Sequence, residues 1–565
     1  MRANPHRLDF GSSRDASLGR ARDIRTSLLP RGVGTSLVIV VITVIIASLL
    51  TPDELRGDTP MIAWIVPSLV RVGPSDAPGN ISSINLSGAR GEYVDTQIII
   101  TAASNTNLTG VNVMLSDLVG PDGAVIAQSN YNLYREYYVS FATGSLDYGP
   151  HATNRPLPPG TYPDPLIPFN DPQTGVPLSG NGASLQAVPF SIPVGHNQPV
   201  WVDLFIPRGI KTSPPGVYTG TIVITSSQDN VMVPIRLTVW NFELPLVPSE
   251  KTLFFIFNNQ RGAVKANQEV LMRHKIMPAR IWMPSFAASE ITNFGLNRTG
   301  LPYYGAATCS SMARAPSVSD IQSQVAQYPP GVFLDIFPAD EIGGCTAIYP
   351  TIKQWAQNAH AAGVNIIITM APDPALYDDG SGIGKPAVDY WVMLPRMWPL
   401  SLAGIPGKVW SYNDLEGDNY SPKWLIDFLP INYRIQAGFL NQMQGATGLL
   451  CWAVDYWPNE ATAWDDVLVG PVSGAYWPGE GILLYPGARV GTTATAPSMR
   501  LKYLRDGIQD YEYVELLKSK NQVSFINSVI RPIAADWHNW TQDQSVLEAA
   551  RLRSGRQLDS LSRAR

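Results

Sequence analysis

Two adjacent carboxylic acids, Asp340 and Glu341, follow an apolar run that ends at a proline. The run Phe333–Ile336 is typical of a buried strand, and Pro338 breaks it. Neighbouring residues within a strand point to opposite faces, so both acids can face one site only where the strand has ended. Crowded carboxyl groups ionise unequally, which leaves one protonated as an acid and the other anionic. Cleavage of a glycosidic bond needs this combination; the alternative is a pair of solvated loop acids.

Two further acids follow predicted strands and are candidates to line the same site. Asp373 comes after the run 365–369, and Asp455 comes after the run 449–454. Aromatic residues are dense around Asp455, and the faces of such rings stack on sugars unless the rings belong to the core; they are Trp452, Tyr456, Trp457, Trp464, Tyr476 and Trp477. We expect at least two of them to face a substrate, with Trp452, Tyr456 and Trp457 as the candidates.

The elements that must position these residues begin with a strand-rich region over 58–248. Short β-rich runs alternate with turn residues and no helical pattern follows them, which predicts an antiparallel β-sandwich; the runs are 96–101, 111–115, 199–206, 220–224 and 231–239. The segment 155–178 contains eight Pro, so we expect a stiff, irregular excursion that packs against a neighbouring domain.

The pattern changes over 250–520, where apolar runs alternate with longer segments. Eight predicted strands within about 250 residues favour a (β/α)₈ barrel, with a doubly wound sheet as the alternative; they are 253–257, 279–282, 332–336, 365–369, 390–393, 409–411, 449–454 and 482–485. Helices are predicted over 351–362, 430–443 and 498–518, and a helical tail over 521–565. In a barrel the site lies beyond the carboxyl ends of the strands, where the acids stand.

The N-terminal residues have the pattern of an export signal. Residues 1–36 hold seven Arg against three Asp, and the apolar run 37–52 follows. This order predicts a single signal-anchor helix with the rest of the chain outside the cell membrane. A cleaved signal peptide, giving a secreted protein, and a buried soluble helix are the alternatives. Either export reading makes a disulfide between Cys309 and Cys345 possible.

Composition excludes several classes of function. The net charge of −5 gives no reason to expect nucleic acid as a partner, and charged residues are only 15% of the chain, which excludes a charged disordered protein. The three Cys show no CxxC spacing, and the sequence has no GxSxG, HExxH or phosphate-binding loop motif. We therefore expect no metal and no cofactor, and nothing in the sequence indicates an oligomeric state.

Several short motifs together resemble glycoside hydrolase family 123 and the related domain of unknown function 4091, the group that contains β-N-acetylgalactosaminidases. The resemblance covers more than half of the chain, from about residue 200 to 518, and the most specific piece is GEGILLYPG at 479–487. Further matching pieces are GVYTG at 216–220, WNFELP at 240–245, HKI at 274–276, ADE at 339–341, VDYWV at 388–392, KVWSY at 408–412, GLLCW at 448–452, PSMRL at 497–501 and RDGIQDYEY at 505–513.

The resemblance implies a β-sandwich followed by a barrel, and a retaining, substrate-assisted cleavage of a 2-acetamido sugar. Glu341 is then the general acid/base, and Asp340 orients the acetamido group that serves as the internal nucleophile, an exception to the scheme with a carboxylate nucleophile. The matching motifs also imply substrate contacts from His274, Lys275 and Trp410. Two alternatives remain: a glycosidase that pairs Glu341 with a distant acid such as Asp455, and a noncatalytic glycan-binding surface protein.

Overall fold

The computed structural model describes residues 59–563, apart from 104, 258–263, 416 and 473. Asp58–Arg565 form one compact unit. The predicted basic segment 1–36 and signal-anchor helix 37–52 lie outside the described residues. Within the described part, none of the helices is both long enough and apolar enough to cross a membrane.

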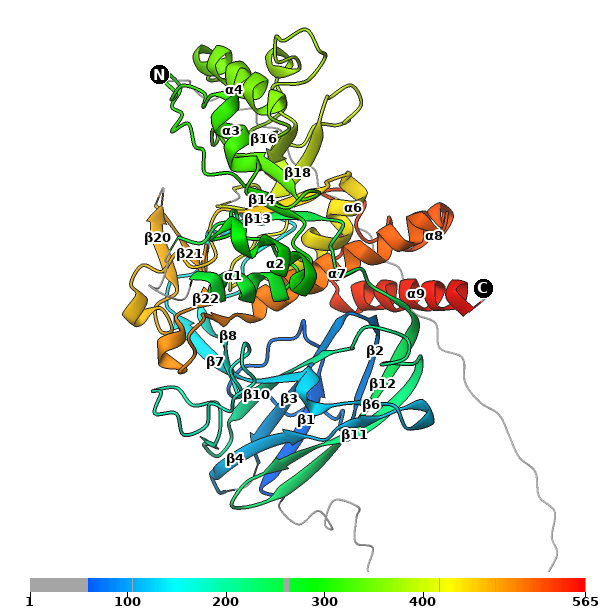
Figure 1. Ribbon diagram of the computed structural model, residues 1–565. Helices are drawn as coiled ribbons and strands as arrows, with labels where there is room; N and C mark the ends of the chain where they lie inside the picture. The colour runs from blue at the N-terminus through cyan, green and yellow to red at the C-terminus, as the bar shows by residue number, and fades with distance from the viewer. Residues whose placement is uncertain (1–58, 104, 258–263, 416, 473, 564–565) are drawn as a thin grey trace, which may run out of the picture. The chain divides into compact units, whose positions relative to one another are not determined.

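The first half of this unit contains two facing sheets (Figure 1). One is antiparallel, in the order β1 (Met61–Val66), β3 (Tyr93–Ala102), β10 (Asn197–Phe205), β7 (Tyr131–Phe141) and β8 (Gly160–Pro168). The other has the order β2 (Ile84–Arg90), β12 (Asn230–Glu243), β11 (Gly216–Thr225), β4 (Leu108–Leu115) and β9 (Phe190–Ile192), with the short strands β5 (Leu118–Val119) and β6 (Val125–Ile126) beside β11. Its β2–β12 pair is parallel.

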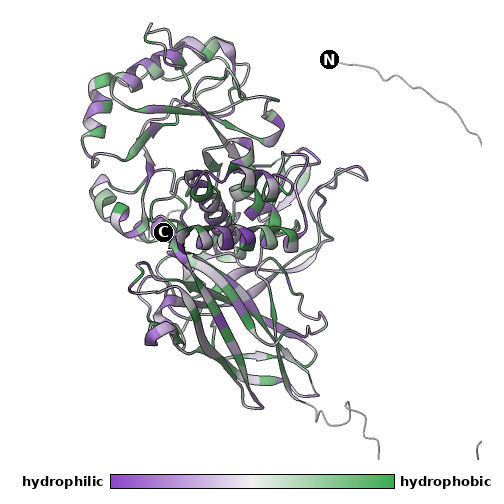
Figure 2. Cartoon of the chain, turned by 90° about the vertical axis from the view of Figure 1, so that its right-hand side faces the viewer, coloured by the Kyte–Doolittle hydropathy of each residue, from purple (hydrophilic) through white to green (hydrophobic). Residues whose placement is uncertain are grey.

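Alternation along the strands accounts for the packing of the two sheets. In β12, Val233, Ile235 and Leu237 are buried, while the residues between them are exposed. Period-two burial places the apolar side chains on one face, where they meet those of the other sheet, such as Ile98 of β3. Hydrophobic and hydrophilic bands accordingly alternate along these strands (Figure 2).

The second half contains a sheet of seven parallel strands. Their order is β13 (Lys251–Phe254), β19 (Gly448–Cys451), β18 (Lys408–Tyr412), β17 (Tyr390–Met393), β16 (Asn365–Thr369), β15 (Phe333–Ile336) and β14 (Arg298–Gly300). A single bridge, Phe254 to Pro278, and a hydrogen bond from Gly300 N to Ala279 O, 3.0 Å long, nearly close this sheet between β13 and β14. The sheet is therefore a nearly closed parallel barrel.

The prediction of a regular (β/α)₈ barrel was wrong. The predicted strand 279–282 contributes only the bridge near Pro278, whose missing N–H limits strand pairing. The predicted strand 482–485 lies outside the barrel, where β22 (Leu484–Tyr485) pairs antiparallel with β23 (Ala496–Pro497). In the described chain, β16 and β17 are followed by turns and not by α-helices, because the segments after them are rich in Pro and Gly.

The α-helices are few, and most precede or follow a barrel strand. They are α1 (Val264–Arg273), α2 (Ala287–Phe294), α3 (Val318–Val325), α4 (Tyr349–Ala361), α5 (Ile431–Ile435), α6 (Asn441–Gln444), α7 (Met499–Ser519), α8 (Val523–Val529) and α9 (Gln544–Arg563). A π-helical segment, Gln436–Leu440, joins α5 to α6. Ser498 caps α7 by accepting a hydrogen bond from Leu501 N, as its sequence position predicts. An antiparallel pair, β20 (Leu468–Val472) and β21 (Ala475–Pro478), completes the described elements.

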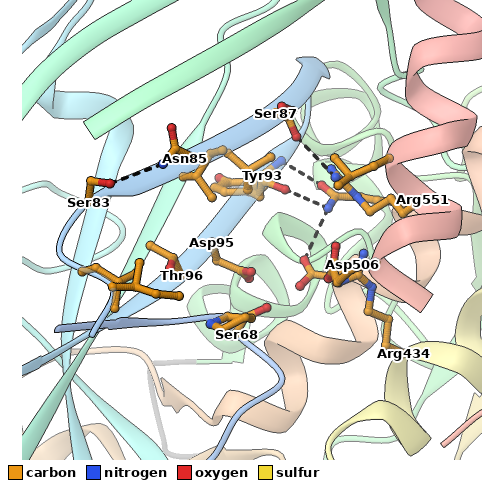
Figure 3. Close-up of a pocket in the computed structure, with 18 residues that line it drawn as sticks. Ser68, Ser83, Asn85, Ser87, Tyr93, Asp95, Thr96, Arg434, Asp506 and Arg551 are labelled. Carbon is orange, nitrogen blue, oxygen red and sulfur yellow. Dashed lines mark hydrogen bonds and ion pairs between the residues drawn. The ribbon is translucent and has the colours of Figure 1, made fainter. Parts of the chain in front are cut away.

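The long helices α7 and α9 join the barrel to the sandwich. The Pro-rich segment contains strand β8, whose Asp164 accepts hydrogen bonds of 2.7 and 2.8 Å from Arg500 of α7. On the other side of the sandwich, a cavity of about 350 Å³ lies between β2, β3 and the helices, and Asp95, Asp506 and Arg551 line it (Figure 3). Arg505 binds both Asp95 (2.8 Å) and Asp506 (3.0 Å), so buried ion pairs connect the two halves.

Candidate active site

A cavity of about 700 Å³ at the barrel opens at the carboxyl ends of its strands. Residues at or beyond the ends of β13, β15, β16, β18 and β19 line it, together with the segments 278–282 and 300–304; among them are Phe257, Trp282, Arg298, Tyr304, Asp335, Asp340, Glu341, Thr369, Tyr412 and Trp452. A pocket formed by the C-terminal ends of parallel strands is where barrel enzymes carry their chemistry.

Asp340 and Glu341 lie together at this pocket, as the sequence predicts for adjacent acids after a broken strand. The Thr369 hydroxyl donates to Asp340 Oδ1 and accepts a 2.8 Å hydrogen bond from Glu341 N. The Tyr412 hydroxyl donates to Glu341 Oε1 at 2.7 Å. Glu341 has φ of +48°, a left-handed conformation that costs energy for a residue with a Cβ and is frequent at functional sites. Thr369 holds this conformation in place through the Glu341 N–H.

The two acids have different electrostatic surroundings. Removal of water from the Asp340 carboxyl is the main cause that raises its pKa above the ordinary value. The hydrogen bond from Thr369 opposes this rise, and the nearby charge of Glu341 adds to it. Burial, and then the hydrogen bond to Glu341, raise the pKa of Tyr412, so its hydroxyl stays protonated as a donor. The site therefore offers two carboxyl groups, each with its own hydrogen-bond donor.

A buried ion pair forms the floor of the pocket. Arg298 of β14 donates two hydrogen bonds of 2.6 Å to Asp335 of β15, and both side chains are fully enclosed. Burial raises the pKa of Asp335, while Arg298 lowers it. Because both Asp335 oxygens are held by one guanidinium, this acid positions the strand ends and leaves the reacting groups to Asp340 and Glu341.

Aromatic rings form part of the wall of the pocket. The rings of Trp452 and Tyr456 lie 4.7 Å apart, and that of Phe257 lies 5.9 Å from Trp452. Behind them, Trp452 Nε1 donates to Glu480 at 2.8 Å. Phe257, Trp282 and Tyr304 line the pocket with about half of their surfaces exposed (53%, 52% and 56%). Exposed rings beside a polar pocket suit the stacking of sugar faces.

The structure places the other predicted site residues of the barrel outside this pocket. Asp455 is buried, and its Oδ1 accepts a 2.7 Å hydrogen bond from Phe257 N. It therefore positions the backbone of Phe257, which lines the pocket. Trp457 and Trp410 are buried in the core. Asp373 accepts hydrogen bonds from Tyr349 (2.8 Å) and Ala375 N (2.9 Å) and caps a short turn after β16.

His274 and Lys275 also lie away from the barrel pocket. Both follow α1 on the side that faces the sandwich. His274 Nδ1 lies 2.6 Å from Val270 O, and burial holds the pKa of this histidine well below its usual value. Lys275 lines a separate cleft. Of the ten predicted residues, Asp340, Glu341 and Trp452 line the barrel pocket, with Tyr456 stacked on Trp452.

The sequence pattern did not single out the two hydroxyl donors of the pocket or two of its aromatic residues, Trp282 and Tyr304. Thr369 and Tyr412 end β16 and β18, so their positions at strand ends were a usable signal. Trp282 ends the predicted strand 279–282 but was not singled out, and Tyr304 stands in a segment without a predicted strand. In the described residues, no group of three or more His, Cys, Asp or Glu is placed to hold a metal ion.

Comparison with known proteins gives two family matches. Residues 71–226 match the glycoside hydrolase 123 N-terminal domain, and residues 418–517 match the glycoside hydrolase 123 catalytic domain. The first match falls on the sandwich; the second covers β19 and α7 and begins after Asp340 and Glu341. No curated protein sequence matches the chain.

One solved structure has a similar fold over most of the chain. A family 123 glycoside hydrolase from Clostridium perfringens, studied for glycolipid glycan hydrolysis, aligns with a TM-score of 0.59 and 13% identity over 90% of this chain and 98% of that one. β-Glucuronidase 3 from Bacteroides uniformis aligns with a TM-score of only 0.26 and 9% identity, over 74% of this chain and 50% of that one, which carries no argument.

The family matches and the paired carboxyl groups in a barrel pocket define the chain as a glycoside hydrolase. Within that class it is a family 123-like protein, and this likeness extends over both the sandwich and the barrel.

Proposed function

We propose that the protein cleaves the glycosidic bond of a 2-acetamido sugar, such as an N-acetylgalactosaminide, by a substrate-assisted retaining mechanism. Glu341 is the general acid/base, and Asp340 orients the acetamido group. The observation that carries this proposal is the adjacent pair at the pocket, each acid with its own donor, Thr369 for Asp340 and Tyr412 for Glu341.

The proposed roles make different demands on the two acids. An acid that orients an acetamido N–H must accept a hydrogen bond, so Asp340 has to be ionised, and the Thr369 hydrogen bond favours that form. Glu341 must deliver a proton to the leaving oxygen and take one back from water. The acetamido oxygen attacks the anomeric carbon, the bond to the leaving oxygen breaks, and water later opens the cyclic intermediate with retention. No carboxylate nucleophile is needed in this scheme.

The test is hydrolysis of aryl β-glycosides by the full chain, with matched sugars that carry or lack the 2-acetamido group. We expect turnover of the acetamido sugar alone. Glu341→Gln should lose roughly 10²- to 10⁴-fold in rate, and less with a better aryl leaving group that needs no proton. Asp340→Asn should lose activity with every leaving group.

Asp466→Asn, which changes an exposed acid outside the pocket, is the matched control and should retain activity. Turnover of sugars that lack the acetamido group would remove the role given to Asp340. Glycan binding with no turnover, unchanged by Glu341→Gln, would favour the noncatalytic alternative.

We further propose that the protein is exported. The basic segment 1–36 before the apolar run 37–52 supports this, and so does the disulfide between Cys309 and Cys345, whose Cα atoms are 4.5 Å apart. Protease added to intact cells should digest the chain if it is outside. Protection of the chain until the cells are opened would contradict export.

A further inference from the structure

A second polar cleft, of about 480 Å³, lies between the sandwich and the first barrel helices. It is bounded by the starts of β3 and β7, the loop after β8, and the carboxyl ends of α1 and α2, and it shares no lining residue with the barrel pocket. Its size suits a mono- or disaccharide. The mechanism proposed above does not use it.

The cleft contains two cations, Arg273 and Lys275, and neither forms a direct salt bridge with a carboxylate among the described residues. Arg273 makes no ion pair there, its buried Nε has no hydrogen-bond acceptor, and its guanidinium lies 5.2 Å from the centre of the Phe294 ring. Lys275 is only 6% exposed, and its ammonium has one hydrogen bond, 3.3 Å long, to Pro245 O. An ammonium group has three N–H donors, so this buried cation is incompletely satisfied.

The remaining charges of the lining do not neutralise these cations. Arg208 is paired with Glu243 at 3.2 Å. Asp171 is the carboxylate of the described lining, and it accepts from Gln173 N (2.8 Å) and Thr174 N (3.0 Å) of its own loop. Burial, and then the charge of Arg208, lower the pKa of Lys275 to about 8, and the charges of Glu512 and Glu92, which form no salt bridge with it, only partly oppose this.

The uncharged groups of the cleft are of the kinds that bind a sugar. The side-chain amides of Asn132, Asn170 and Asn293 make no hydrogen bond within the described chain, so their donors and acceptors are available. The rings of Tyr93 and Phe205, 4.9 Å apart, contribute apolar surface. Amides and rings together provide the contacts that hydroxyl groups and the apolar faces of a sugar require.

We propose that this cleft is a second saccharide site, distinct from the barrel pocket, which takes a sugar bearing a carboxylate or sulfate group. Arg273 and Lys275 bind the anionic group, and the three Asn side chains bind hydroxyl groups. This inference does not depend on the proposed hydrolysis.

The test is calorimetric titration of the full chain carrying Glu341→Gln, which keeps the probe from being cleaved. The probe is a disaccharide of a uronic acid and a sulfated N-acetylhexosamine. Its comparators are the same disaccharide with the sulfate removed and the uronate methylated, and inorganic sulfate. We expect binding of the anionic disaccharide, with both comparators weaker by roughly tenfold or more.

Substitutions test whether the anionic disaccharide binds in this cleft. Arg273→Gln should weaken the anionic disaccharide by roughly tenfold or more. Lys275→Asn should do the same, since Asn tolerates the φ of +62° at this position. Two control variants should leave the affinity unchanged. They are Arg236→Gln, which removes an exposed cation on β12, and Trp282→Ala, which changes the barrel pocket. Thermal unfolding of each variant verifies that it is folded.

Three results would overturn the inference: equal affinity for the neutral disaccharide, no effect of Arg273→Gln in a folded variant, or loss of binding in Trp282→Ala. Binding of inorganic sulfate as tightly as the disaccharide would overturn the saccharide part. A failure of aryl glycoside hydrolysis would leave this result unaffected, because the titration measures binding alone.

Discussion

Asp340 and Glu341 are neighbours in sequence, but each carboxyl group is controlled by a different hydroxyl. The Thr369 hydrogen bond lowers the pKa of Asp340, against the rise caused by burial and by Glu341. Thr369→Val removes that bond, so the pKa of Asp340 should rise further. The acidic limb of the kcat/KM profile for an acetamido glycoside should then move to higher pH.

Thr369→Ser retains the hydroxyl and is the matched control, so its profile should stay close to that of the natural protein. A uniform loss of activity at all pH values in Thr369→Val would show that Thr369 only supports the backbone at Glu341.

At this scale the sequence predicted the acids but not their partners. Adjacent acids after Pro338 are a rare pattern with a geometric reason, whereas Thr and Tyr are common in strands, so only the positions of Thr369 and Tyr412 at strand ends could have marked them. His274 and Lys275 were predicted as site residues from a motif resemblance, which does not indicate where their side chains lie. The structure places them after α1, toward the sandwich.

Among the elements, the loop after β15 carries the acid pair and is tied by the disulfide between Cys309 and Cys345, which are 36 residues apart. A crosslink over that separation restricts the unfolded chain and contributes about 3 to 4 kcal/mol. The double variant Cys309→Ser, Cys345→Ser should lose about that much unfolding free energy in urea. Equal stability of the double variant and the oxidised natural protein would contradict this.

His360 connects helix α4 to the segments before β17. Its side chain is 2% exposed, and its Nδ1 and Nε2 lie 2.9 Å from Oδ2 of Asp379 and of Asp389, respectively. Burial opposes the charged imidazolium, and so does Lys385, but hydrogen bonds to the two carboxylates prevail and raise the pKa of His360 above 6.5. A raised pKa means that the stabilisation is present below pH 6.5 and is lost as pH rises through the folded value. The unfolding free energy should therefore fall as pH rises through that range.

His360→Gln should remove the contribution of the imidazole, so that from pH 6 to pH 9 the unfolding free energy in urea falls less in the variant than in the natural protein. The same pH dependence in both proteins would show that the imidazole is not charged in the folded state.

Most barrel strands were predictable because they are continuous apolar runs between polar or Pro/Gly-rich segments. Strand β14 was missed because its three residues, Arg298–Gly300, contain no apolar side chain. The run 482–485 has the composition of a buried strand and is buried, but composition does not distinguish a parallel barrel strand from the antiparallel β22. Local pattern therefore identified strands better than it identified the sheet that each strand joins.

Over the described molecule as a whole, sandwich and barrel share a buried boundary of ion pairs. The expectation that the Pro-rich excursion packs against a neighbouring domain agrees with the contact of its Asp164 with Arg500. Lys502 and Arg505 of the same helix bind Asp203 of β10, both at 2.7 Å. These partners could not be predicted from sequence pattern, since each pair joins residues about 300 or more positions apart.

This boundary predicts that sandwich and barrel unfold together. Asp164→Asn leaves Arg500 buried with only neutral acceptors, and breaking one side of a buried pair costs about 3 to 5 kcal/mol. Asp147→Asn, which breaks the exposed pair with Arg155, is the control and should hardly change the unfolding free energy, because solvent screens this pair. In urea, intrinsic fluorescence and far-ultraviolet circular dichroism should report one coincident transition, shifted by the first change and hardly by the second. Two separate transitions in the natural protein would show that the boundary does not couple the halves, because the buried pair would then stabilise only one of them.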